Sequence, residues 1–274
     1  MARECPQVSR KVVKPLRFTS ETITDGVSER LFTLGDVPGV LWSPAGAAGP
    51  MPGRPMPSRP LVLLAHGGGQ HKKAPAMQGR ARRLATACGF AAAAIDAPGS
   101  GDRPRTEEDE RFIAELREKM AAGEPVGPQI ARFNAAQAER AVPEWRATLD
   151  ALQAQPGLDG PVGVWGLSMG SATGVPLAAA EPRITAAVFG LAGHETLGEA
   201  AARITIPVEF LLQWDDELIP RESGLALFDA FASHEKSLHA NPGRHADVPM
   251  FEVESSLRFF GRHLSPGGSP GDGG

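Results

Sequence analysis

The segment PVGVWGLSMGSATG, residues 161–174, constrains the fold of this chain more than any other part of its sequence. Its first apolar residues predict a short strand at 162–165, and its Ala-containing second half predicts a helix. Between them lies GLSMG, a G-x-S-x-G pattern in the strand–turn–helix context that presents a serine, here Ser168, on a tight turn. Taken alone, the pattern also fits an ordinary Gly-Ser loop.

An acidic residue and a histidine follow two later predicted strands. Residues 208–214, VEFLLQW, predict a buried strand that runs into Asp215 and Asp216. A shorter strand at 237–240 leads through a Pro-Gly turn to His245. The chain order is therefore serine, aspartate, histidine, each just after a strand. This is the order of the triad in α/β-hydrolases and differs from the orders in chymotrypsin and subtilisin.

On these motifs the chain resembles the α/β-hydrolase superfamily over residues 17–264, in particular its dienelactone-hydrolase-like and small bacterial serine esterase branches. The resemblance implies an α/β fold with a mostly parallel twisted sheet, helices on both faces and a small helical lid insertion. It implies a triad of Ser168 as nucleophile, His245 as base and Asp216 as the acid that orients the base. Asp216 is preferred over Asp215 because the family loop carries an aspartate four residues before a proline.

A glycine-rich segment after another predicted strand supplies the expected oxyanion donors. LVLLA at 61–65 predicts a buried strand, and HGGGQH follows it. The resemblance implies that the backbone N–H groups of Gly68 and Met169 hold the oxyanion, and three consecutive glycines allow such a close backbone approach. A flexible loop is the alternative. His66 and Arg103 are expected to brace their loops, Arg103 through an ion pair.

Further polar and aromatic residues near the predicted strand ends are weaker site candidates. His71, His194 and Trp214 follow or end predicted strands, and we predict them as substrate-pocket residues. The competing interpretation is that the histidines are simply exposed and that the tryptophan lies in the core. His239, within a predicted strand, and His263, on the terminal helix, are the alternative bases.

The whole chain fits one α/β domain, which we predict over residues 1–264. Short strands at its beginning predict an antiparallel edge, and alternating strands and helices then predict a parallel sheet with right-handed connections. The final residues, 265–274, form a low-complexity tail that we predict to be disordered. The other predicted elements are strands at 16–22, 30–34, 40–43 and 91–96, an irregular loop at 44–60 and a helix at 76–88.

Residues 102–143 interrupt this alternation, and we interpret them as a candidate lid insertion. Residues 107–122 are charged and amphipathic, with Phe112 and Leu116 on the apolar face. A second helical pattern at 130–152 leads back to the strand before the serine. A lid over the strand ends would shape the pocket and exclude water. An ordinary surface helix is the alternative.

Composition and missing motifs argue against several other classes of function. The formal net charge is −4 and no basic stripe occurs, so we expect no nucleic-acid partner. Without a secretory signal or a bilayer-length apolar run, we expect no membrane partner and a cytoplasmic location. Cys5 and Cys88 offer neither a disulfide framework nor metal-ligand spacing, and no zinc or phosphate-loop motif occurs. We therefore expect no metal and no cofactor, while the oligomeric state stays open.

The leading functional hypothesis is a serine hydrolase that cleaves a carboxylic ester of a small or medium substrate through an acyl-enzyme. Dienelactone hydrolases proper use a cysteine nucleophile, and this chain has Ser168 there. Cleavage of a thioester, a lactone or a peptide requires the same constellation, so these reactions remain alternatives. A non-hydrolytic ligand-binding or biosynthetic protein with this fold is the alternative from a different class.

Overall fold

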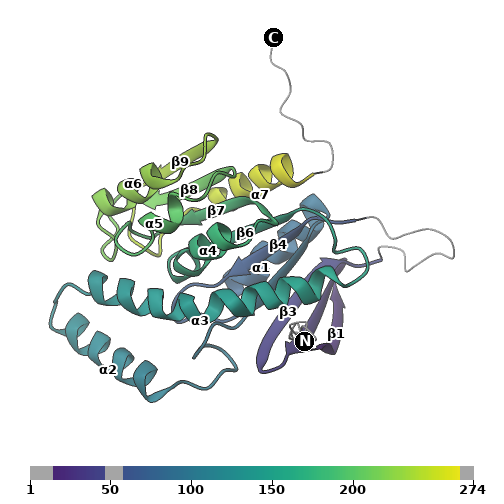
Figure 1. Ribbon diagram of the computed structural model, residues 1–274, viewed down its shortest axis with the longest axis horizontal. Coiled ribbons are helices and arrows are strands. Elements are labelled where there is room, and N and C mark those ends of the chain that lie inside the picture. Colours follow the sequence, from purple (N-terminus) through teal and green to yellow (C-terminus); the bar gives the residue numbers. More distant parts are fainter. Residues whose placement is uncertain (1–14, 47–57, 266–274) are drawn as a thin grey trace, which may run out of the picture.

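The computed structural model describes residues 15–46 and 58–265 of the 274-residue chain. Predictions for Cys5, for the centre of the loop at 44–60 and for the tail after residue 265 lie outside the described residues. The described part contains one nine-stranded sheet in the order β1-β2-β3-β5-β4-β6-β7-β8-β9 (Figure 1). The strands are β1 (Leu16–Thr24), β2 (Val27–Leu34), β3 (Val37–Pro44), β4 (Leu61–Ala65), β5 (Ala91–Ile95), β6 (Val162–Gly166), β7 (Ile184–Gly190), β8 (Val208–Gln213) and β9 (Lys236–Asn241).

The sheet is antiparallel at one end and parallel through the rest. β1, β2 and β3 pair antiparallel, and β3 also runs antiparallel to β5. From β5 across to β9 every neighbouring pair is parallel. This arrangement confirms the predicted fold class. β2 starts earlier than predicted because its pairing with β1 continues through polar Ser28 and Glu29 to the turn at Asp25.

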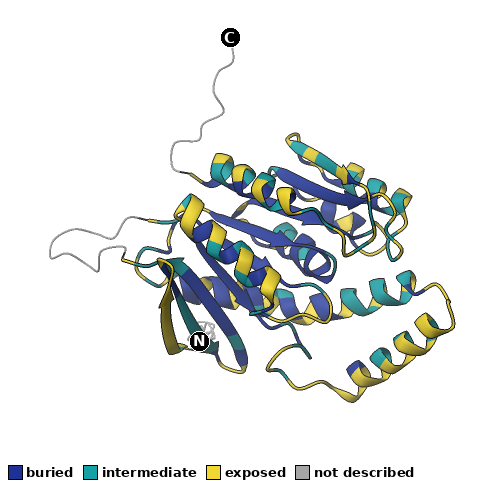
Figure 2. Ribbon diagram, turned by 180° about the vertical axis from the view of Figure 1, so that it is seen from behind, coloured by how far each residue is buried: buried dark blue, intermediate teal, exposed yellow. Residues whose placement is uncertain are grey.

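The central strands are buried on both faces, as their continuous apolar sequences require. Every residue of β4, β5 and β6 is buried, which is typical of parallel strands that helices cover from both sides (Figure 2). Alternate residues of β4 enter two separate cores. Leu61 and Leu63 belong to the core on one face of the sheet, whereas Val62 and Leu64 belong to the core on the other face.

Helices cover both faces of this sheet (Figure 1). α3, α4, α5 and α6 contribute to the core on one face, and α1 and α7 contribute to the core on the other. Within the described ranges, no helix has both the length and the apolar character that a bilayer crossing requires. The helices are α1 (Pro75–Arg83), followed by a π-helical turn (Leu84–Cys88), α2 (Glu107–Ala121), α3 (Gly127–Gln153), α4 (Met169–Ala180), α5 (Gly198–Ala201), α6 (Arg221–Ala230) and α7 (Met250–Leu264).

The predicted insertion forms α2 and the first part of α3, which lie beside each other beyond the sheet (Figure 1). A capping box starts α2: the Thr106 side chain accepts from the Asp109 N–H, and the Asp109 carboxylate accepts from the Thr106 N–H. Asp109 also accepts from Gln137 of α3 at 2.9 Å and is the only buried residue of α2. The rings of Phe112 and Phe133 stack with centroids 3.8 Å apart. α2 is thus held to α3 at one end and along one face.

Two glycines allow β4, β6 and α4 to approach one another where the serine turn lies. A Cβ added at Gly170 would lie 2.2 Å from the carbonyl oxygen of Ala65 at the end of β4. A Cβ added at Gly166 would lie 2.2 Å from the Gly170 carbonyl oxygen. The neighbouring atoms are backbone and cannot rotate away. The requirement for glycine on both sides of Ser168 is therefore steric, as the sequence predicts.

Gly170→Ala is expected to destabilise the fold by about 3 kcal/mol, because the new methyl group displaces β4 or α4. Gly261→Ala in α7 is the matched control, since nothing lies within 4 Å of its added Cβ. That control should stabilise the protein by about 0.5–1 kcal/mol through helix propensity. Urea unfolding of both variants measures the difference, and equal stabilities would contradict the steric interpretation.

Candidate active site

Ser168 occupies a strained backbone conformation at the turn between β6 and α4. Its φ is 58° and its ψ is −122°, a region that residues with a side chain rarely adopt. Two hydrogen bonds tie this turn to β7: the Ser168 N–H donates to the Gly190 carbonyl at 2.9 Å, and the Gly190 N–H donates to the Ser171 hydroxyl at 2.9 Å. The buried Ser171 oxygen also lies 2.7 Å from the Gly166 carbonyl oxygen. Sequence reasoning missed Ser171, whose bracing role depends on contact with a distant strand.

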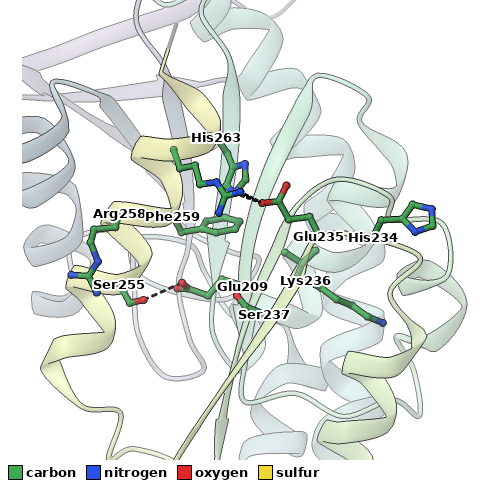
Figure 3. A pocket seen from close by; sticks show the side chains of 11 residues that line it. Glu209, His234, Glu235, Lys236, Ser237, Ser255, Arg258, Phe259 and His263 are labelled. Carbon is green, nitrogen blue, oxygen red and sulfur yellow. Dashed lines mark hydrogen bonds and ion pairs between the residues drawn. The ribbon is translucent and has the colours of Figure 1, made fainter. Parts of the chain in front are cut away.

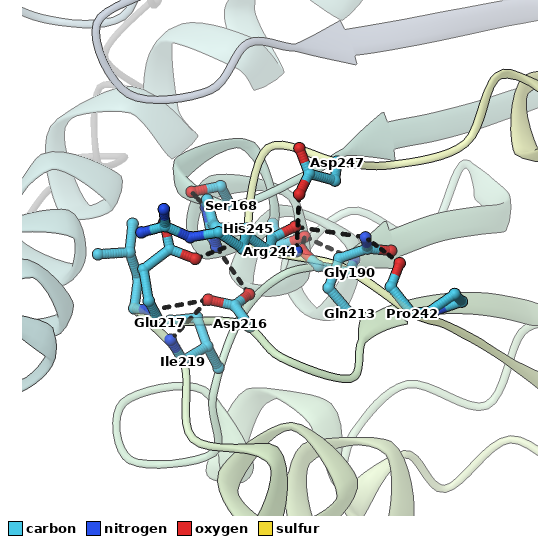
Figure 4. A network of polar contacts seen from close by, with 12 residues as sticks. Ser168, Gly190, Gln213, Asp216, Glu217, Ile219, Pro242, Arg244, His245 and Asp247 are labelled. Atoms are coloured by element: carbon cyan, nitrogen blue, oxygen red, sulfur yellow. Dashed lines mark hydrogen bonds and ion pairs between the residues drawn. The ribbon is translucent and has the colours of Figure 1, made fainter.

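The structure brings Ser168, His245 and Asp216 into one hydrogen-bonded chain (Figure 4). His245 Nε2 lies 2.9 Å from Ser168 Oγ, and His245 Nδ1 lies 2.7 Å from Asp216 Oδ2. The His245 and Asp216 side chains are only 15% and 4% exposed. These three residues come from loops after β6, β9 and β8, so the parallel sheet itself assembles them.

Asp216 and not Asp215 faces the histidine. The backbone N–H groups of Leu218 and Ile219 donate to Asp216 Oδ1 at 2.8 and 2.9 Å, which leaves Oδ2 for His245. Asp215 is exposed, and its backbone N–H donates to the Gly243 carbonyl at 3.1 Å. The loop register therefore matches the one inferred from the family resemblance.

The loop that carries His245 is held by two side chains that sequence reasoning missed. Glu217 Oε2 accepts from the His245 backbone N–H at 2.9 Å, and this hydrogen bond lowers the pKa of the Glu217 carboxyl. The buried Gln213 amide donates to the carbonyls of Pro242 and Arg244 at 3.4 and 3.3 Å (Figure 4). Each residue is adjacent or close to a predicted site residue, but only the fold shows that it reaches the histidine loop.

The backbones of Gly68 and Met169 lie next to each other beside Ser168. A Cβ added at Gly68 would be 4.0 Å from the Met169 Cβ, and both residues line one cavity with Ser168 and His245. Within the described part of the chain, neither backbone N–H donates to a protein acceptor. Met169 is also the first residue of α4, where the helix dipole favours negative charge. Two backbone N–H groups without an acceptor among the described residues thus belong to residues that line the cavity beside Ser168.

The loops after β4 and β5 are braced by buried polar contacts. His66 Nδ1 donates to the Gly67 carbonyl and its Nε2 accepts from the Ala97 N–H, so the imidazole is neutral; burial lowers its pKa. This confirms the bracing role predicted for His66. Arg103 likewise forms the predicted ion pair, donating to both carboxylate oxygens of Glu144 at 2.6 and 2.8 Å.

A buried lysine joins the same two loops and was missed from the sequence. Lys72 Nζ lies 2.7 Å from Asp96 Oδ2 and 2.5 Å from Asp102 Oδ2. Burial opposes its charge, but the hydrogen bonds to Asp102 and Asp96 raise the pKa of the ammonium group overall. Asp96 is fully buried at the end of β5. Nothing in the local sequence marks these residues as partners, because they are 24 and 30 positions apart.

Two cavities meet at Ser168 and His245. The first, of about 460 Å³, extends from Gly68 and Met169 to α2 and α3, and we call it the α2–α3 cavity. The second, of about 600 Å³, lies between α1 and α7, and we call it the α1–α7 groove. The apolar residues that line the far part of the α2–α3 cavity are Phe112, Ile113, Leu116, Ile130 and Phe133.

Of the three predicted pocket residues, only His71 lies at these cavities. It lines the α2–α3 cavity. The His194 ring instead lies against the first residue of α5, where an added Cβ on Gly198 would be 2.2 Å from its Nε2. Trp214 is 44% exposed and stacks under the Arg221 guanidinium at 4.0 Å. His194 and Trp214 line neither the α2–α3 cavity nor the α1–α7 groove, so the structure does not bring these two predicted pocket residues to the cavities at Ser168.

His239 and His263, the alternative bases, lie away from Ser168. His239 Nδ1 is 2.7 Å from Glu252 Oε2, and His263 Nε2 is 3.5 Å from Glu235 Oε1. His263 lines a separate hollow of about 490 Å³ between α7 and the beginnings of β8 and β9, at the opposite ends of the strands from His245 (Figure 3). Burial raises the pKa of Glu209 in this hollow. In the described ranges no group of three or more His, Cys, Asp or Glu side chains could hold a metal ion.

Comparison with known proteins places the chain in a family. No protein-family model matches it, and no curated protein sequence matches it. The solved structure of a cold-adapted esterase from an Arctic intertidal metagenomic library is similar to it with 35% identity and a TM-score of 0.69. The match covers 89% of this chain and 97% of that one. The chain belongs to the α/β-hydrolase superfamily, in the same esterase family as that structure.

More distant α/β-hydrolases share the fold alone. An acetyl xylan esterase from Thermoanaerobacterium is 16% identical with a TM-score of 0.61, over 90% of this chain and 87% of that one. A dienelactone hydrolase from Anabaena variabilis is 19% identical with a TM-score of 0.58, over 91% of this chain and 99% of that one. The α/β-hydrolase fold is thus common to this chain and these two proteins. The α1–α7 groove and the α2–α3 cavity are defined here from the residues of this chain alone.

Proposed function

We propose that this α/β-hydrolase is a serine esterase that cleaves small or medium carboxylic esters through an acyl-enzyme. The observation that carries the proposal is the continuous chain of hydrogen bonds from Ser168 Oγ through His245 to Asp216. A serine hydroxyl is a weak nucleophile unless a base takes its proton, and this geometry supplies a base whose orientation is fixed. A non-hydrolytic binding protein has no need of that arrangement.

In the proposed reaction, Ser168 Oγ attacks the ester carbonyl carbon while His245 Nε2 takes its proton. Asp216 Oδ2 accepts a hydrogen bond from the His245 Nδ1–H and stabilises the imidazolium that forms. The carbonyl oxygen becomes an oxyanion, which the N–H groups of Gly68 and Met169 bind. His245 then gives its proton to the departing alkoxide, and the acyl group stays on Ser168. Water releases the acid by the same steps, with His245 again acting as base.

The cavities support a substrate of small or medium size. The α2–α3 cavity has about 460 Å³ and an apolar far wall, which suits one apolar half of an ester. α2 supplies part of this wall while its outer face is exposed (Figure 2), and we propose that it acts as a lid. Thioester and lactone cleavage are alternatives that a substrate panel distinguishes, and a cytoplasmic location stays a prediction from the sequence.

Ser168→Ala is expected to reduce hydrolysis of the best p-nitrophenyl ester by at least about 10³-fold, because Ser168 has the only hydroxyl among the described residues that is hydrogen-bonded to His245. The turn is preformed, so the melting temperature should stay near that of the wild type. A fluorophosphonate probe should label the wild-type protein and not the variant. Activity above roughly a tenth of the wild-type rate would show that Ser168 is not the nucleophile.

Asp216→Asn is expected to lower kcat by roughly 10³- to 10⁴-fold, because an amide cannot stabilise the imidazolium and favours the wrong histidine tautomer. Asp215→Asn is the matched control at the neighbouring position. Asp215 is exposed, so its variant should stay within about threefold of the wild type. Steady-state kinetics on one ester compares the two, and a reversal of the effects would assign the acid to Asp215.

Replacing Phe112 and Leu116 with serine is expected to change relative kcat/KM across acyl chain lengths by several-fold, because each apolar contact in a substrate pocket contributes on the order of 1–3 kcal/mol. Met120→Ser is the control, since Met120 lies on α2 with 57% exposure and outside the α2–α3 cavity. Ester profiles and melting temperatures are measured together. A lowered melting temperature with an unchanged profile would identify α2 as a surface helix and not a lid.

A further inference from the structure

The α1–α7 groove is the part of the site that the proposed mechanism leaves unassigned. Its volume is about 600 Å³, and it begins at Gly68, Ser168 and His245. From there it continues between α1, represented by Ala76 and Arg80, and the start of α7. An ester held at Ser168 has two halves, and the α2–α3 cavity accommodates one of them. The other half would enter this groove.

Arg80, in the wall of this groove, forms no ion pair with any residue that the structure describes. Its guanidinium carbon lies 4.8 Å from the centroid of the Trp165 ring, in β6 just before the serine turn. Among the described residues, Arg80 has no carboxylate partner, and burial without a compensating partner lowers its pKa to about 10. The group therefore remains charged at neutral pH. The Arg80 side chain is half-buried and lines the groove that reaches Ser168, so a cation without a protein counter-charge at this place indicates an anionic ligand.

Unlike Arg80, the neighbouring arginines of α1 lie close to carboxylate partners. Arg83, one turn further along the same wall, forms an ion pair with Glu254 of α7. Arg82, on another face of the helix, lies 3.9 Å from Asp25. The indole N–H of Trp165, on which Arg80 stacks, is also buried without an acceptor among the described residues. Among the described residues that line the groove, Arg80 is therefore a positive charge without a carboxylate partner, whereas Arg83 is paired.

We propose that Arg80 binds a carboxylate carried by the substrate, so that the preferred substrates are esters with one free carboxylate on the half that lies in the α1–α7 groove. A guanidinium binds a carboxylate through two parallel hydrogen bonds, and one unpaired charge matches a single negative charge better than a dianionic phosphate. The proposal specifies the substrate class of the Ser168 site and therefore rests on the proposed esterase function.

The first test uses the wild-type enzyme and pairs of esters that differ only in charge. Monomethyl glutarate, adipate and suberate are compared with methyl esters of unbranched fatty acids of matched length, and ω-carboxyalkyl acetates with the corresponding alkyl acetates. In at least one series, kcat/KM for the best carboxylate ester should exceed that of its neutral partner by about tenfold or more. A ratio below about twofold in both series would overturn the proposal.

The second test assigns any preference to Arg80. Arg80→Met keeps the apolar stem and its packing on Trp165, and it should reduce the charged-to-neutral ratio by about tenfold, mainly through KM. Arg82→Met removes a positive charge from the same helix outside the groove and should leave the ratio unchanged. An unchanged ratio in Arg80→Met, or an equal loss with both ester types, would overturn the proposal. If Arg80→Met fails to fold, the ratio of kcat/KM between carboxylate and neutral esters in the wild-type enzyme still tests the proposal.

A third measurement separates this proposal from the proposed function. Adipate should raise the melting temperature of the wild-type protein and have no effect on Arg80→Met, and this readout requires no turnover. A protein that cleaves no ester but shows the Arg80-dependent shift would refute the esterase function and keep the carboxylate site. A protein that cleaves neutral esters, prefers no carboxylate ester and shows no shift would refute the carboxylate site alone.

Discussion

The contact between backbones at the end of β4 and the start of α4 is the constraint on which the rest of the site depends. Gly170 lies so close to the Ala65 carbonyl that a methyl group cannot enter, and Gly166 lies equally close to Gly170. Because β6 must turn into α4 within this space, Ser168 is forced to a positive φ. That conformation directs its hydroxyl toward His245 and leaves the Met169 N–H free beside it. Geometry that is costly locally therefore serves several parts of the site at once.

The cost of that turn is offset by polar contacts around it and not by apolar packing alone. Ser171 links the turn to β7, and Lys72 links the loops that follow β4 and β5. Asp216 receives two backbone N–H groups from its own loop before it reaches the histidine. Each of these groups has protein partners, whereas the Gly68 and Met169 N–H groups have no acceptor, and the Arg80 guanidinium no carboxylate, in the part of the chain that the structure describes. Gly68 lies where the two cavities meet, Met169 lines the α2–α3 cavity and Arg80 lines the α1–α7 groove.

Much of this architecture could be predicted from the sequence because local signals carry it. Three signals depend only on neighbouring residues: the glycines around Ser168, the periodicities of the strands and the spacing of Asp216 from a proline. The bounds of α2 also agree with the expected ones to within one residue. His194 and Trp214 could not be placed, because a loop side chain after a strand can turn to either side of the sheet edge. Arg80 lies in a run of basic residues, and only the positions of Glu254 and Asp25 distinguish it from its neighbours.

The position of β9 at the edge of the sheet affects how the active-site geometry is lost on heating. In the described sheet β9 is an edge strand with β8 as its single neighbour, and the histidine loop continues directly from it. Two hydrogen bonds, from the Trp214 N–H to Asn241 and from the Asp215 N–H to Gly243, continue the ladder toward that loop. Edge segments exchange their amide hydrogens through local opening well below the free energy of global unfolding. His245, the proposed general base, is thus attached to one of the least protected parts of the fold, so heat should inactivate the protein before the central strands separate.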